Sequence, residues 1–218
     1  MTPRPYLSFS QLTTFERSPE KYADQYLYDK KQRITRNIAK WSDLADSLKD
    51  EEASGDPLLD LVIAKMPKFD RMDLPVEDPS GVWVTYQRDN KEYRACVPVL
   101  ENKGGNIPIL ALPDTAKSGY GAFKEYKSSV RKFTKKMVDD SSQITFYATA
   151  MWLVTGKVPE DIELVCVETE YVEHGRVEVT GNIYRYPTKR TVGDIIRMTK
   201  RIRGVWAGIQ ELCRKELQ

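Results

Sequence analysis

The sequence contains very little histidine and cysteine, on which many hydrolytic and zinc sites depend. His174 is the one histidine, and it lies beside Gly175 in a predicted turn rather than next to a nucleophile. The three cysteines, Cys96, Cys166 and Cys213, are far apart in the chain. They provide neither a disulfide framework nor the close pairs of a metal knot. Any chemistry is therefore expected from carboxylates and lysine.

Long hydrophobic runs and an excess of one charge sign are also missing. The longest apolar run, 148–154, is far shorter than the ~20 residues of a membrane helix. The first residues lack the apolar stretch of a signal peptide, so we predict a cytoplasmic protein without membrane spans. With 34 basic and 32 acidic residues, the net charge of +2 does not by itself imply a nucleic-acid partner. A length of 218 residues with 40% hydrophobic residues predicts one globular domain, or one domain with a helical extension.

Hydrophobic periodicity and turn residues predict helices at both ends of the chain, with two groups of strands between them that are separated by one long helix. Helices are expected over 8–27, 34–53, 57–66, 135–155 and 192–216. Strands are expected over 82–87, 93–100, 107–112, 122–127, 162–171 and 177–186, with hairpin turns at 89–90 and 173–175. This order predicts an α+β fold with a central mixed sheet flanked by helices. The single domain 1–218 then has a helical part (1–75), a sheet core (76–190) and a C-terminal helix (191–218).

Individual polar residues predict where several helices begin. Ser10 is suited to cap a first short helix, and Ser18 followed by Pro19 is suited to start a second one. Thr191 and Asp194 have the spacing of a reciprocal capping pair at the start of the last helix.

The strand predicted over 122–127 carries two charged residues two positions apart. Glu125 and Lys127 therefore project from the same face, and Tyr126 from the opposite, packed face. Asp114 follows the preceding strand and reaches the same point if the two strands pair. Such a set suits metal-dependent phosphodiester cleavage, because Mg²⁺ takes oxygen ligands and lysine can orient water or stabilise charge on the phosphate. The alternative is a solvated ion pair on an exposed strand.

The helix predicted after this strand carries Gln143 and Tyr147, which share one face because they are four residues apart. Pro113-Asp114, then Glu125-Tyr126-Lys127, then this pair resemble the motifs of the PD-(D/E)XK nuclease superfamily. The resemblance is to its RecB-like branch of exonucleases and CRISPR-associated adaptation nucleases, with the branch's Q-x-x-x-Y motif at residues 143–147.

The beginning of the chain resembles the same branch. Residues 8–22 are similar to its N-terminal signature, S-x-S-x-L-x-x-F-x-x-C-P-x-x-F/Y. The cysteine of the iron–sulfur members is replaced by Ser18, and three scattered cysteines cannot supply four thiolates. We therefore predict no iron–sulfur cluster.

The resemblance implies a restriction-endonuclease-like core and a deoxyribonuclease that depends on Mg²⁺ or Mn²⁺. It implies that Asp114 and Glu125 bind the metal, that Lys127 positions or activates the attacking water, and that Gln143 and Tyr147 steady the site or the DNA. The implied substrates are single-stranded DNA or duplex ends, as processed exonucleolytically in recombination, repair or phage replication. A recombination or replication protein is a candidate partner.

The family places a histidine or glutamate ligand on a helix before the sheet, and here the sequence departs from its pattern. Ala45 lies where a histidine is expected and Lys49 where a glutamate is expected. Asp46 and Glu52 are the nearest candidate substitutes, together with Asp43 and Asp50. The alternative for these four residues is a solvated helix face without a metal. For the protein, the alternatives are a DNA-binding module of the same fold without catalysis, or an interaction subunit of a recombination complex.

A basic segment follows the strand that carries Glu125 and Lys127. It surrounds one aromatic residue with four cations: Arg131, Lys132, Phe133, Lys135 and Lys136. Lysine and arginine neutralise phosphates, and an aromatic ring stacks on bases. We therefore predict that this segment is a loop that contacts DNA.

Overall fold

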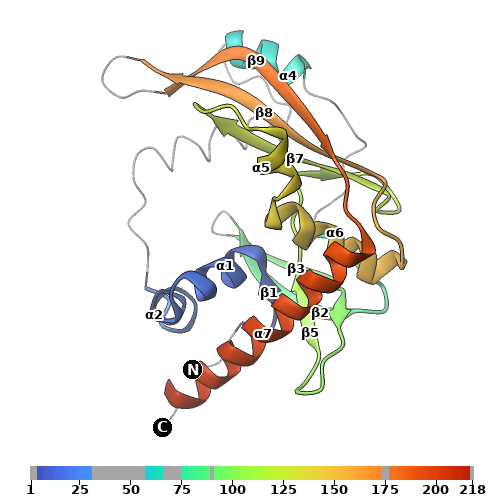
Figure 1. Ribbon diagram of the computed structural model, residues 1–218. Coiled ribbons are helices and arrows are strands. Elements are labelled where there is room, and N and C mark those ends of the chain that lie inside the picture. The colour runs from blue at the N-terminus through green and yellow to red at the C-terminus, as the bar shows by residue number, and fades with distance from the viewer. Residues whose placement is uncertain (1–3, 31–56, 66–74, 89–90, 173–176, 217–218) are drawn as a thin grey trace.

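The computed structural model describes residues 4–30, 57–65, 75–88, 91–172 and 177–216 (Figure 1). The N-terminal elements are β1 (Leu7–Ser8), α1 (Phe9–Arg17), α2 (Pro19–Tyr22), a π-helical turn η1 (Ala23–Leu27) and α4 (Pro57–Lys65). Then come β2 (Val82–Arg88), β3 (Lys91–Val97), β4 (Val99–Leu100), β5 (Ile107–Leu110), β6 (Thr115–Ala116) and β7 (Ala122–Ser129). The last elements are α5 (Lys135–Asp139), α6 (Ser142–Thr155), β8 (Asp161–Tyr171), β9 (Val177–Thr188) and α7 (Val192–Glu216). The fold is thus mixed α+β, as predicted. The helix predicted over 34–53 lies outside the described residues.

Within the described residues, the strands form three hydrogen-bonded sheets rather than the one central sheet predicted. Their orders are β1-β5-β4, β2-β3 and β6-β7-β8-β9. The hairpins β2-β3 and β8-β9 are antiparallel, which confirms the predicted pairings. The strand at 107–112 does not pair with the strand at 122–127, because β5 lies between β1 and β4. The short β6 pairs with β7 instead, in antiparallel register.

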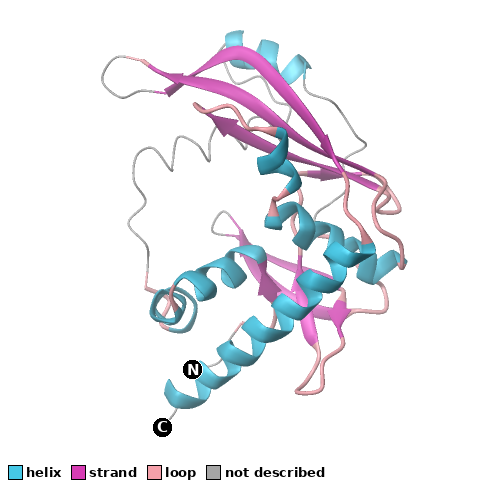
Figure 2. Ribbon diagram, viewed as in Figure 1, coloured by secondary structure: helices cyan, strands magenta, loops and turns pink. Residues whose placement is uncertain are grey.

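One main core joins the four-stranded sheet to the rest of the molecule. It contains Ile109 of β5, Ile144 and Phe146 of α6, Leu164 of β8 and Ile202 of α7, all buried. In Figure 2 the four-stranded sheet lies at the top and the other strands lie below, with α6 at the level between them. No residue of α6 is fully exposed, and Phe146 to Met151 are all buried, so the helix has no polar face open to solvent.

The helix predicted over 135–155 is interrupted, and this prediction was wrong. α5 ends at Asp139, and α6 begins at Ser142. The Ser141 hydroxyl accepts a hydrogen bond from the N–H of Ile144 and so caps a new helix in the middle of the predicted one. Gly156 ends α6 with a φ of 69°, a conformation that glycine adopts at little cost.

The predicted helix starts are correct in two of three cases. Ser18 caps α2, with Pro19 as its first residue. Thr191 and Asp194 cap each other's backbone N–H at the start of α7. The first helix begins earlier than predicted: Ser8, rather than Ser10, accepts the capping hydrogen bond of α1.

The residues of the N-terminal signature serve packing. Leu12 and Tyr22 are fully buried, and Phe15 meets Tyr22 edge to face at 5.5 Å between ring centroids. The guanidinium of Arg201 on α7 forms two hydrogen bonds to the Glu16 carboxylate of α1, at 2.6 and 2.5 Å. These contacts join α1 to α2 through Phe15 and to α7 through Glu16. In the described part of the chain, no helix has the length and apolar character needed to cross a membrane.

Candidate active site

The central residue of the candidate site is Glu125, on the strand β7. Its neighbours β6 and β8 hydrogen-bond to both edges of β7, and Glu125 is only 3% exposed. The Lys127 Nζ donates a hydrogen bond to Glu125 Oε1 at 2.5 Å, which confirms that the two side chains share one face. Tyr126 packs on the opposite face against the cluster of Val62, Val165, Val167 and Val179, as predicted.

Asp114 reaches β7 by a route that differs from the predicted one. It directly precedes β6, whose Thr115 pairs with Lys124. The Asp114 Oδ2 accepts a hydrogen bond from the backbone N–H of Tyr126 at 2.7 Å. The carboxylate thus takes the place that a strand carbonyl occupies in a sheet ladder, and it is fixed beside Glu125.

The motif on α6 faces the same point. The Gln143 Nε2 donates hydrogen bonds to Glu125 Oε1 at 2.8 Å and to Tyr147 Oη at 2.9 Å. Tyr147 is buried and meets Phe123 of β7 edge to face. The four-residue spacing therefore does what the sequence predicted: it brings both side chains to the face of the helix that meets β7.

The charges of the site determine the protonation of its lysine and tyrosine. Burial by itself lowers the pKa of Lys127, but the Glu125 and Asp114 carboxylates outweigh it and raise this pKa above its usual value. Burial and the charge of Glu125 raise the pKa of Tyr147 well above its usual value. At neutral pH Lys127 is thus an ammonium ion and Tyr147 a neutral phenol.

The donor set determines which metal would suit the site. Asp114 and Glu125 offer carboxylate oxygens, whereas zinc sites take nitrogen and sulfur ligands as well. Over the described ranges, no group of three or more histidine, cysteine, aspartate or glutamate residues could hold a metal ion. One or two carboxylates are sufficient for Mg²⁺, which keeps several waters and binds substrate phosphate. The residues therefore fit Mg²⁺ or Mn²⁺. The candidate third ligands, Asp46 and Glu52, lie outside the described residues, as do Asp43 and Asp50.

The basic segment after β7 is only partly a loop. Lys135 and Lys136 lie in α5, where each forms an ion pair one helical turn away, with Asp139 and Asp140 respectively. The predicted loop at 131–136 thus ends at Thr134, which caps α5. Two of its four cations are thus compensated by carboxylates in the last turn and at the C-cap of α5.

The first half of the segment packs against β9. Phe133 is half-buried with its ring 6.4 Å from that of Tyr186. The Lys132 ammonium lies 4.7 Å from the centre of the Tyr184 ring and 3.7 Å from Glu168 Oε1. Arg131 is exposed. The packing of Phe133 gives its ring a role in the core, so base stacking by Phe133 stays a prediction.

Sequence reasoning did not single out Arg190, whose side chain contacts the helix that carries Gln143 and Tyr147. Arg190 is buried at the point where α5 and α6 meet, and it hydrogen-bonds to Thr145 of α6. A lone arginine between a strand and a helix has no local pattern that signals burial. The sequence does contain a signal for the helix break that Arg190 contacts: Asp140-Ser141-Ser142 is a run of helix-capping residues inside a predicted helix.

No protein-family model matches the sequence, and no curated protein is significantly similar to it.

Proposed function

We propose that this chain is a metal-dependent deoxyribonuclease with a restriction-endonuclease-like core. The observation that carries the proposal is the convergence on one buried carboxylate. Lys127 and Gln143, which come from different elements, both donate to Glu125 Oε1. The Asp114 carboxylate accepts a hydrogen bond from the backbone N–H of Tyr126, the residue that follows Glu125 on β7. A solvated ion pair on an exposed strand would leave Glu125 accessible, and it is buried.

The roles follow from charge and protonation. Asp114 and Glu125 would hold Mg²⁺ or Mn²⁺, which supplies charge to polarise a phosphate and lowers the pKa of a bound water. Lys127 remains protonated, so it acts as a hydrogen-bond donor and positive charge near the phosphate rather than as a general base. Gln143 fixes the orientation of Glu125, and the neutral Tyr147 accepts the second hydrogen bond of Gln143.

The substrate class in this proposal is DNA with accessible ends, single-stranded or duplex. Arg131 and Lys132 are the exposed cations nearest in sequence to β7, which ends at Ser129. Neither is paired inside α5: Arg131 is exposed, and Lys132 would exchange its ion pair with Glu168 for one with phosphate. A role in recombination, repair or phage DNA processing remains part of the proposal.

The test is cleavage of end-labelled single- and double-stranded DNA in Mg²⁺, in Mn²⁺ and in EDTA. We expect metal-dependent cleavage by the wild type and a loss of about 10²–10³-fold in Lys127→Ala, the usual effect of removing one donor to transition-state charge. Lys157→Ala is the matched control, because Lys157 is exposed beyond the end of α6. A folded wild-type protein that shifts DNA but cleaves none with either metal would refute the nuclease and leave the binding module.

A further inference from the structure

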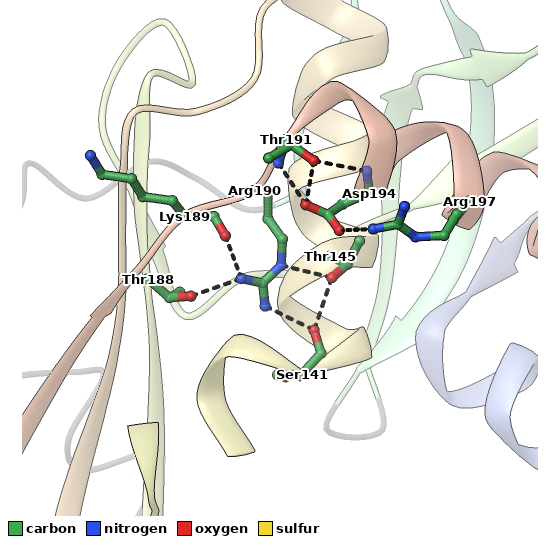
Figure 3. Close-up of polar contacts among 8 residues, drawn as sticks. All are labelled: Ser141, Thr145, Thr188, Lys189, Arg190, Thr191, Asp194 and Arg197. Carbon is green, nitrogen blue, oxygen red and sulfur yellow. Dashed lines mark hydrogen bonds and ion pairs between the residues drawn. The ribbon is translucent and has the colours of Figure 1, made fainter. Parts of the chain in front are cut away.

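The guanidinium of Arg190 lies where α5, α6, β9 and α7 come together (Figure 3). Arg190 is 7% exposed, and it follows β9 in the short link to α7. Its five N–H groups make five hydrogen bonds, two to hydroxyls and three to backbone carbonyls. The acceptors are Thr145 Oγ1 (2.7 Å), Thr188 Oγ1 (2.8 Å), and the carbonyl oxygens of Lys189 (2.8 Å), Val138 (3.1 Å) and Ser141 (3.1 Å).

These acceptors lie on both sides of the break between the two helices. The Val138 carbonyl belongs to the last turn of α5, and Ser141 is the cap of α6. The Thr145 hydroxyl accepts from Arg190 and donates to the Ser141 carbonyl at 3.0 Å, so the two contacts on α6 are joined. The guanidinium therefore bridges the break: it adds a side-chain donor on each side of it, to carbonyls that also accept the backbone N–H groups of Ser141 and Thr145.

The charge of Arg190 is balanced at a distance. None of its five acceptors is a carboxylate. The Thr188 hydroxyl that accepts from Arg190 donates to Asp139 Oδ1 at 2.7 Å, which links the guanidinium to a negative charge through one bridging group. Burial lowers the pKa of Arg190, and the charges of Asp194, Asp139 and Asp140 oppose that change. An arginine remains charged in such a place and fills every acceptor, whereas a lysine has three donors on one atom.

Gln143 stands between the two contacts of Arg190 on α6. Ser141 is two residues before it, and Thr145 is two residues after it. The direction in which α6 leaves the break determines where the Gln143 amide lies, and that amide donates to Glu125. We propose that Arg190 is a positioning residue: by holding the break between α5 and α6, it directs Gln143 onto Glu125. The effect on catalysis rests on the proposed nuclease function, but the effect on Gln143 does not.

The test follows the side-chain amide of Gln143 by ¹⁵N NMR, with its signals assigned by their disappearance in Gln143→Met. In Arg190→Lys and in Thr145→Val, we expect these signals to move toward those of exposed glutamines. We also expect their hydrogens to exchange with water about ten-fold faster, as after the loss of one hydrogen bond. Thr145→Ser keeps the hydroxyl and should restore the wild-type signals. Lys189→Gln removes an exposed neighbouring charge and keeps the backbone carbonyl, so it should change nothing.

Two results separate this inference from the proposed function. If the wild type cleaves DNA, the folded Arg190→Lys and Thr145→Val variants should lose kcat about ten-fold while KM stays within about two-fold, because the cations that contact DNA are unchanged. If the wild type does not cleave DNA, the nuclease proposal fails, and the Gln143 signals alone decide whether Arg190 is a positioning residue. Wild-type Gln143 signals in a folded Thr145→Val protein, which is the mildest change, would overturn the positioning role even if Arg190→Lys does not fold.

Discussion

The ion pair between Lys127 and Glu125 should contribute measurably to stability as well as to the site. Lys127→Met removes an ammonium ion that lies 2.5 Å from Glu125 Oε1. The carboxylate end is 3% exposed, but the lysine side chain is 36% exposed. Breaking a buried ion pair costs about 3–5 kcal/mol, and breaking an exposed one costs about 0–1 kcal/mol. For a pair that is buried at one end, we expect the free energy of unfolding to fall by about 1–2 kcal/mol.

A double-mutant cycle separates the interaction free energy of the Lys127–Glu125 pair from the other effects of each substitution. Glu125→Gln, Lys127→Met and the double variant are compared with the wild type by urea unfolding at pH 7. The variant Glu125→Gln keeps the shape of the side chain and removes its charge, which also relieves its repulsion from Asp114. Because Lys127 and Glu125 contact each other directly, we expect the effects of the two single changes on the free energy of unfolding to be non-additive, with a coupling of about 1 kcal/mol.

The pH dependence of the coupling has a definite sign. The folded state raises the pKa of Lys127 above its usual value of 10.5, because Glu125 and Asp114 outweigh burial. The contribution of this ion pair to the free energy of unfolding is therefore complete below the usual lysine pKa, and it is lost as the pH rises through the raised pKa of Lys127. A coupling below about 0.3–0.5 kcal/mol at pH 7, which is the error of additivity, would refute the reasoning. Lys157→Met is the control and should stay within about 0.5 kcal/mol of wild type.

Two more changes probe the hairpin β2-β3 and the four-stranded sheet that carries the site. Gly81→Ala would place its Cβ 2.1 Å from a backbone oxygen of the facing strand β3, so we expect a loss of about 1–3 kcal/mol in urea unfolding. Gly121→Ala meets nothing within 4 Å and is its control; an equal loss in both would contradict the steric reason. Burial alone would raise the pKa of Glu163, but Arg185 and Lys124 outweigh burial and lower this pKa. The contribution of Glu163 to the free energy of unfolding is therefore present above the usual carboxyl range and is lost as the pH falls through the lowered pKa. Glu163→Gln should therefore be less stable at pH 7 and lose less stability on acidification, and an acid loss as steep as in the wild type would contradict this.

The sequence by itself predicted those features that depend on neighbours within a few residues. Glu125 and Lys127 share a face because strands repeat every two residues. Gln143 and Tyr147 share a face because helices repeat every 3.6 residues. The same local rules predicted the capping pair of α7 and the two antiparallel hairpins.

Only the tertiary structure determined how those local features are combined. The sequence suggested that strands 107–112 and 122–127 pair directly, but β5 pairs with β1 and β4 and lies in another sheet. Asp114 reaches the site through a two-residue strand and a side-chain contact to a backbone N–H. Strand propensity does not specify a partner, because every strand offers the same backbone donors and acceptors.

The break between α5 and α6 has the same kind of cause. Its capping serine could be found in the sequence, but helix propensity alone predicts a continuous helix there. The group that completes the break is Arg190, 49 residues away from the Ser141 carbonyl that it contacts. A backbone carbonyl has two lone pairs, so one that already accepts a backbone N–H, as Ser141 does from Thr145, can accept a second donor that the fold brings to it. Local periodicity therefore determined which side chains share a face, and contacts between distant residues determined that those faces meet at Glu125.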